Sequence, residues 1–176
     1  MTDPDRVMLD IETLGLDAGS ALVSIGAVRF DSDGVGETFE ESVSLASCQA
    51  AGLTIDGETL EWWLTQDAAA REQLTGGIEL AAALKRFAEF YHGADEIWAN
   101  SPSFDCEMLE AAYEAIGETA PWEFYEERDF RTLSSLAVAP EPEQDGVEHD
   151  ALDDARHQAE IAAETLRRIE PTEASR

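Results

Sequence analysis

The first part of the chain alternates short apolar runs with turn-forming residues. An apolar run within residues 6–10 is typical of a buried strand, and residues 21–30, rich in Val, Ile and Ala, predict a second one. Residues 36–45 alternate apolar and polar positions, which predicts a third, half-exposed strand. The connections are short, and the first is a loop containing residues 15–19. These segments therefore predict an antiparallel meander.

From about residue 56 onwards the apolar positions recur at helical spacing. The clearest case is the i, i+4, i+7, i+11 series of Leu80, Leu84, Phe87 and Tyr91. Helices are predicted over residues 56–66, 67–74, 78–92, 104–116, 132–138 and 151–169, with a strand over 96–99 and Phe130 on a short strand. This order predicts an α/β domain, an α+β mixed sheet flanked by helices. We expect one domain over residues 1–169 and a flexible tail over 170–176.

The charge is strongly unbalanced. Eleven Lys and Arg stand against 39 Asp and Glu, a net charge of −28, and Lys85 is the one lysine. Such a surface repels itself unless salt screens it. We interpret the composition as adaptation to a high-salt cytoplasm; the alternative is an acidic protein of an ordinary cell. In either case the charge balance argues against a basic nucleic-acid-binding surface, so a polyanionic partner must be held by something other than Lys and Arg.

Other classes are excluded by what the sequence lacks. No apolar run approaches the ~18–20 residues that cross a bilayer, and the N-terminus has no signal-peptide pattern. The two cysteines, Cys48 and Cys106, are too few for a disulfide scaffold. We therefore expect a cytoplasmic protein with two free thiols and no membrane association.

The first candidate for chemistry is the Asp10-Ile11-Glu12-Thr13 segment at the end of the first strand. Side chains two positions apart on a strand share a face, so Asp10 and Glu12 point together. Two neighbouring carboxylates repel each other unless a cation lies between them, and hard cations such as Mg²⁺ prefer oxygen ligands. The alternative is two solvated carboxylates in a turn.

Two later segments carry similar chemistry. Asp105 lies at the head of a predicted helix, where an acid also favours the helix dipole. His149 precedes the last helix and Asp154 lies in its first turn; alone, His149 has the character of a surface histidine. Together, four acids and one titratable base match what two-metal hydrolysis of a phosphodiester requires. Bound cations would also supply the positive charge that the surface lacks.

These segments resemble the three motifs of the DEDDh family of 3′-5′ exonucleases. Asp10-x-Glu12-Thr13 resembles the first motif, Asp105 takes the place of the second, and His149-x-Ala151-x-x-Asp154 resembles the third. The segments Leu60–Leu64 and Arg128–Leu133 resemble the small phage- and actinobacterial-type exoribonucleases of this family.

The resemblance implies an RNase H-like fold with a mixed five-stranded sheet. It implies two divalent cations, Mg²⁺ or Mn²⁺, held by Asp10, Glu12, Asp105 and Asp154, with His149 as general base. The implied substrate is the 3′ end of a single-stranded nucleic acid, RNA favoured over DNA, and the products are nucleoside 5′-monophosphates. Relatives are often homodimers, so a homodimer is a further expectation.

The resemblance also nominates residues for holding the substrate. Thr13 and Leu14 are candidates for contacting the terminal sugar and base. Trp62 is a candidate for stacking on a base, a contact worth ~1–3 kcal/mol, whereas Trp63 is expected in the core. Arg131 and Arg128 are candidates for phosphate contacts, or for pairing with the abundant acids.

Alternative functions remain open from the sequence. A DNA-directed exonuclease for proofreading or repair fits the same motifs, because the sequence shows no contact to a 2′-hydroxyl. A non-catalytic binding module on the same fold would be marked by loss of an acidic ligand, and none is lost. An HD-type phosphohydrolase is disfavoured by the strand-rich start and by only three histidines.

Overall fold

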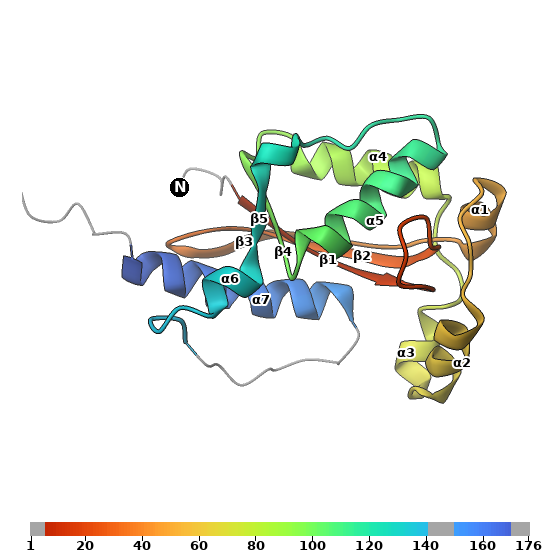
Figure 1. The fold of residues 1–176 in the computed structure, drawn as a ribbon, viewed down its shortest axis with the longest axis horizontal. Helices are drawn as coiled ribbons and strands as arrows, with labels where there is room; N and C mark the ends of the chain where they lie inside the picture. The colour runs from red at the N-terminus through yellow and green to blue at the C-terminus, as the bar shows by residue number, and fades with distance from the viewer. Residues whose placement is uncertain (1–5, 141–149, 170–176) are drawn as a thin grey trace, which may run out of the picture.

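The computed structural model describes residues 6–140 and 150–169 and contains one five-stranded mixed sheet (Figure 1). The strand order is β3-β2-β1-β4-β5. The strands are β1 (Arg6–Thr13), β2 (Leu22–Asp31), β3 (Gly34–Ser42), β4 (Glu96–Ala99) and β5 (Glu127–Asp129). The first three pair antiparallel, whereas β4 and β5 run parallel to β1. The meander and the mixed sheet predicted from the sequence are confirmed.

Helices cover both faces of this sheet (Figure 1). One hydrophobic cluster contains Val7, Leu9 and Ile11 of β1 together with side chains of α4 and α5, and a second contains Met8 together with side chains of α6 and α7. The helices are α1 (Leu45–Ala50), α2 (Gly57–Thr65), α3 (Ala68–Glu72), α4 (Leu80–Tyr91), α5 (Pro102–Ala115), α6 (Phe130–Ser134) and α7 (Ala151–Ile169), with a 3₁₀ turn at Phe124–Glu126.

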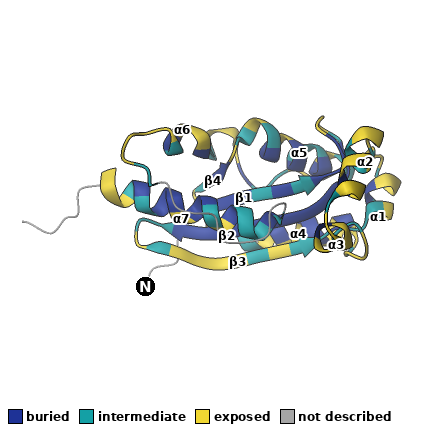
Figure 2. Ribbon diagram, turned by 90° about the horizontal axis from the view of Figure 1, so that it is seen from below, coloured by how far each residue is buried: buried dark blue, intermediate teal, exposed yellow. Residues whose placement is uncertain are grey.

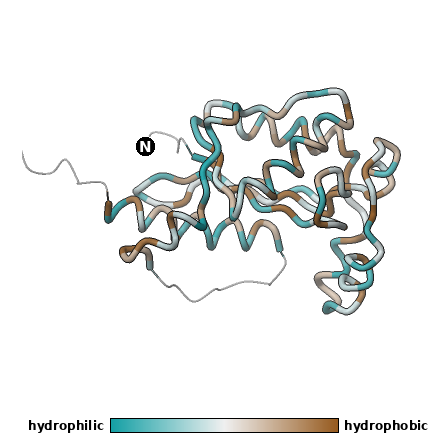
Figure 3. The backbone as a smooth tube through the Cα atoms, in the orientation of Figure 1, coloured by the Kyte–Doolittle hydropathy of each residue, from teal (hydrophilic) through white to brown (hydrophobic). Residues whose placement is uncertain are grey.

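The central strands are buried on both faces because helices lie above and below them. β2 is buried along all but its last residue, and hydrophobic residues concentrate along the central strands (Figures 2 and 3). This explains why β2 is an almost continuous apolar run. β3, at the sheet edge, is exposed over much of its length. No described helix combines the length and the apolar character needed to cross a membrane.

The structure corrects three local predictions. The third strand ends at Ser42, not at Leu45, because Ser44 accepts a hydrogen bond from the backbone of Ser47 and begins α1, a helix that the pattern did not predict. Phe130 lies in a helix, not on a strand, because the Asp129 side chain caps α6. That helix ends at Ser134, so the predicted span of residues 132–138 is wrong.

Candidate active site

Two acidic side chains project from the end of β1 towards α7. Strand alternation puts Asp10 and Glu12 on the same face as Met8, which packs in the cluster that contains α7 residues. β4 is parallel to β1, so α5 starts at the sheet edge where β1 ends, and Asp105 lies in its first turn. Residues 95 positions apart in the sequence are thereby brought to one edge of the sheet.

A glycine allows α7 to approach these carboxylates. Gly26 of β2 lies opposite Asp10 in the antiparallel register. A Cβ atom at Gly26 would lie 2.2 Å from the Ala151 carbonyl carbon and 2.3 Å from the Leu152 nitrogen, so only glycine fits. The start of α7 therefore rests on the sheet beside Asp10, and the third acid, Asp154, is in its first turn.

The three acids converge. Asp10, Glu12 and Asp154 each offer a carboxylate oxygen, and these oxygens lie within 4.8 Å of one another. Asp105, only 4% exposed, lies near enough for its charge to raise the pKa of Asp10. The structure thus brings three of the four acids nominated from the sequence within 4.8 Å of one another and places the fourth, Asp105, close enough to Asp10 to interact with its charge.

Burial and mutual repulsion disfavour the charged forms of this cluster. Burial, followed by the neighbouring Asp154, raises the pKa of Glu12 to about 8. Burial raises the pKa of Asp105 to about 7, and burial and Asp105 raise the pKa of Asp10 well above its ordinary value. Several carboxylate oxygens this close together form the donor set that hard divalent cations prefer. The residues present therefore fit the cations implied by the sequence.

A glutamine that the sequence analysis missed contacts this cluster. The amide nitrogen of Gln158 donates a 2.9 Å hydrogen bond to Asp10 Oδ1. Gln158 lies one helical turn after Asp154, on the same side of α7. The i, i+4 spacing from Asp154 is the signal that could have identified it.

A cavity of about 420 Å³ opens beside Glu12. Its lining includes Glu12, Thr13, Leu16, Asp56, Trp62 and Phe104. Thr13 contributes to this lining, and its hydroxyl donates to the Gly15 carbonyl at 2.7 Å; its contact with a substrate stays a prediction. The prediction for Leu14 is wrong, because its side chain is completely buried in the core. The leucine of this loop that reaches the cavity is Leu16, which is 77% exposed and which the sequence analysis did not nominate.

The two adjacent tryptophans have different environments. Trp63 is buried as expected, and its indole nitrogen donates to the Thr13 carbonyl at 3.0 Å, fixing α2 against the end of β1. Trp62 is 42% exposed and lines the cavity. An exposed ring beside the carboxylates has the surroundings that stacking on a base requires.

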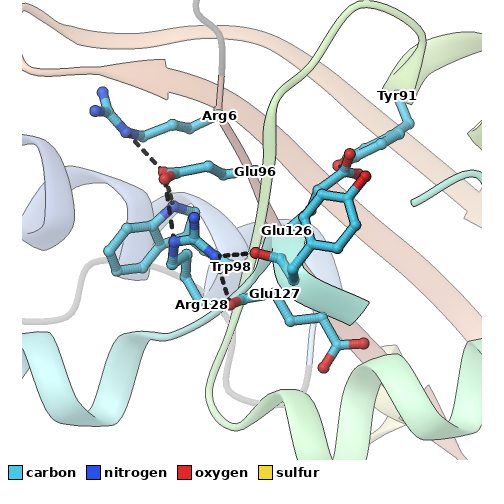
Figure 4. Close-up of polar contacts among 8 residues, drawn as sticks. Arg6, Tyr91, Glu96, Trp98, Glu126, Glu127 and Arg128 are labelled. Carbon is cyan, nitrogen blue, oxygen red and sulfur yellow. Dashed lines mark hydrogen bonds and ion pairs between the residues drawn. The ribbon is translucent and has the colours of Figure 1, made fainter. Parts of the chain in front are cut away.

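The two candidate arginines also differ. Arg128 pairs with Glu96 at 3.1 Å, in a cluster that also contains Arg6 and Trp98 (Figure 4). This is the pairing alternative raised from the sequence. Arg131 is exposed, and its positive charge lowers the pKa of Asp105, which places it near the acidic cluster.

The third-motif histidine, His149, lies outside the described residues, so its role stays a prediction. The adjacent Asp150 is described: its Oδ1 accepts hydrogen bonds from the backbone of Leu152 and Asp153 at the start of α7. Asp150 therefore stabilises the beginning of the helix that carries Asp154.

The two cysteines, Cys48 and Cys106, are both free and buried.

The fold and the acidic cluster together define a DEDDh 3′-5′ exonuclease of the RNase H-like fold. The family described as the 3′-5′ exoribonuclease Rv2179c-like domain matches residues 5–166, and the chain belongs to this family. It is therefore a hydrolase of phosphodiester bonds.

The chain is also similar to a phage nuclease in sequence and to a solved nuclease domain in fold. The chain is 26% identical over 187 aligned positions to the exodeoxyribonuclease of Enterobacteria phage T4, covering 84% of this chain and 82% of the phage protein. The nuclease domain of 3′hExo, a DEDDh family member solved with bound rAMP, has the same fold with a TM-score of 0.65 and 12% identity. That match covers 93% of this chain and 92% of the solved one.

Proposed function

We propose that this exonuclease degrades single-stranded RNA from its 3′ end and releases nucleoside 5′-monophosphates, with two divalent cations, Mg²⁺ or Mn²⁺, as cofactors. The observation that carries the proposal is the convergence of Asp10, Glu12 and Asp154 within 4.8 Å. Several carboxylate oxygens in one buried cluster form the donor set that hard divalent cations prefer, and a bound cation would favour the ionised forms of these acids.

Each residue then has a distinct task. Asp10, Glu12, Asp105 and Asp154 hold the cations. When bound, the cations neutralise charge on the scissile phosphate and favour ionisation of the attacking water. His149 removes the proton from that water, because a histidine exchanges protons near neutral pH.

The cavity beside Glu12 receives the terminal nucleoside. Trp62 and Leu16 offer exposed apolar surface for the base, and Thr13, which lines the same cavity as Glu12, is assigned to the sugar. Arg131 is assigned to the phosphate, since it is an exposed cation close to Asp105. Leu14 has no part in this arrangement.

DNA is the alternative substrate. RNA is favoured by the description of the family as exoribonucleases, and DNA by the phage T4 relative, which is an exodeoxyribonuclease. Digestion of end-labelled RNA and DNA of equal sequence, with Mg²⁺ or Mn²⁺ and then with EDTA, separates the two. RNA should be shortened faster from the 3′ end in a cation-dependent manner. Equal or faster loss of DNA would overturn the RNA preference, and EDTA-resistant cleavage would overturn the cation requirement.

We also propose that the net charge of −28 adapts the protein to a high-salt cytoplasm. Repulsion among surface acids is screened as the Debye length falls to ~3 Å at molar salt. The melting temperature and the activity should therefore rise between 0.1 and 2 M KCl. A fall in both over this range would contradict the proposal.

The homodimer stays a prediction, and a measurement of the protein's molecular mass in solution tests it.

A further inference from the structure

Gln158 is a polar exception on the inward face of α7. This face packs on the sheet mainly through small apolar side chains, including Ala155, Ala159 and Ala162, all of which are completely buried. Gln158 is only 7% exposed. Thr165, the other buried polar residue of the helix, satisfies its hydroxyl within the helix by bonding to the Ile161 carbonyl at 2.6 Å.

The amide of Gln158 is satisfied at one end and not at the other. Its nitrogen donates to Asp10 Oδ1 at 2.9 Å, whereas its oxygen, Oε1, is buried without a hydrogen-bond partner among the described residues. Exchanging the two amide atoms would place an oxygen against the Asp10 carboxylate, so chemistry fixes this orientation. A buried acceptor without a donor costs folding free energy.

This cost indicates that folding alone does not account for the residue. A methionine or leucine would fill a similar volume among the alanines without leaving a polar atom unpaired. What only the amide provides is a neutral donor to Asp10. A lysine or arginine there would neutralise the cluster and compete with a cation, and a glutamate would add a further negative charge.

We propose that Gln158 is a positioning residue for Asp10. Its amide holds Oδ1 and so restricts rotation of the carboxylate, which would keep Asp10 oriented to bind a cation together with Glu12 and Asp154. The inference rests on the proposed cation site. Partners that orient a ligand in this way typically contribute ~10–100-fold to metal affinity or activity.

The test is the substitution Gln158→Met, measured by calorimetric titration of Mn²⁺ into the full-length protein without substrate. The expected result is Mn²⁺ binding weakened by about tenfold or more, while the melting temperature of the metal-free protein is unchanged or higher. His157→Met is the control, since that side chain leaves the same helix roughly 100° away. It should bind Mn²⁺ as the wild type does.

Three outcomes would overturn the inference. Gln158→Met could bind Mn²⁺ within twofold of the wild type. It could lose metal-free stability with its Mn²⁺ affinity intact, which would make Gln158 a purely structural residue. If the wild type itself bound no Mn²⁺, the cation site of the proposed function would fail together with this inference, whereas the first two outcomes leave that site standing. Gln158→Leu, measured in parallel, provides a second readout if the methionine variant does not fold.

Discussion

Half-buried acids lie at both ends of the β1–β4 strand pair, and the two ends balance the charge differently. At the start of β1 and β4, the carboxylate of Glu96 accepts hydrogen bonds from Arg6, Arg128 and the Trp98 indole (Figure 4). At the end of β1, the carboxylates of Asp10, Glu12 and Asp154 converge, and the hydrogen-bond donor described for Asp10 is the neutral amide of Gln158.

This difference distinguishes an ion-pair cluster that stabilises the fold from an acidic cluster that is suited to binding a cation. Where arginines meet an acid, the fold supplies its own counter-charge. Where several acids meet a neutral amide, a bound cation would supply the counter-charge that arginines supply at Glu96. Two of the protein's eleven Lys and Arg contact a single glutamate, Glu96, at the start of β4.

Removing one converging acid should have the largest effect. Asp10→Asn takes away a ligand but keeps the size of the side chain, so we expect hydrolysis to fall to background. The melting temperature of the metal-free protein should not fall, because one source of repulsion is lost. A nuclease assay and thermal unfolding measure the two. Asp33→Asn, in the exposed turn between β2 and β3, is the matched control and should retain full activity. Substantial activity in Asp10→Asn would refute the ligand assignment.

Displacing α7 should weaken the site without altering any acid. Gly26→Ala places a methyl group 2.2 Å from the Ala151 backbone, so the start of the helix must shift away from the sheet. We expect a loss of about 1–3 kcal/mol in unfolding free energy and a marked loss of Mn²⁺ binding, because Asp154 moves with the helix. Gly57→Ala, which meets nothing within 4 Å, is the control. Tight Mn²⁺ binding by Gly26→Ala would show that the close contact does not position Asp154.

The pH dependence of stability should differ with and without cation. The folded-state pKa is raised from 4.5 to about 8 for Glu12 and from 3.8 to about 7 for Asp105. The folded metal-free protein therefore binds more protons than the unfolded chain, and its unfolding free energy should fall as pH rises from about 4 to about 8. Saturating Mn²⁺ should oppose this fall. Denaturant unfolding at several pH values measures it, and identical slopes with and without Mn²⁺ would contradict the account.

Disrupting the arginine-balanced end should have the smallest effect. Arg128→Met removes one of the two arginine partners of Glu96, and Arg128 is 38% exposed, so the ion pair is partly screened by solvent. We expect a loss of about 0.2–1 kcal/mol in unfolding free energy, with unchanged Mn²⁺ affinity. Chemical denaturation and titration check both. A large fall in Mn²⁺ affinity would mean that the two ends are coupled.

The sequence predicted most of the sheet and the acidic cluster for physical reasons. Strand alternation puts Asp10 and Glu12 on one face, and the positions of Asp105 and Asp154 near helix starts follow from local patterns. Contacts between distant segments leave no comparable local trace. The fit of Gly26 under Ala151 and the bond from Gln158 to Asp10 join residues far apart in the chain.

The remaining errors have local causes. Helix α1 was missed because only Cys48 is buried among its six residues, so it shows no apolar stripe. Leu14 and Leu16 lie two positions apart in one loop, and sequence alone does not tell which of them faces the solvent. The structure buries Leu14 and exposes Leu16.

The most direct test of the account is anomalous scattering from crystals of the wild-type protein grown with Mn²⁺. We predict a manganese peak within bonding distance of carboxylate oxygens of Asp10, Glu12 and Asp154, with no comparable peak beside Glu96. Manganese bound elsewhere, with these three carboxylates directed away from it, would contradict the account.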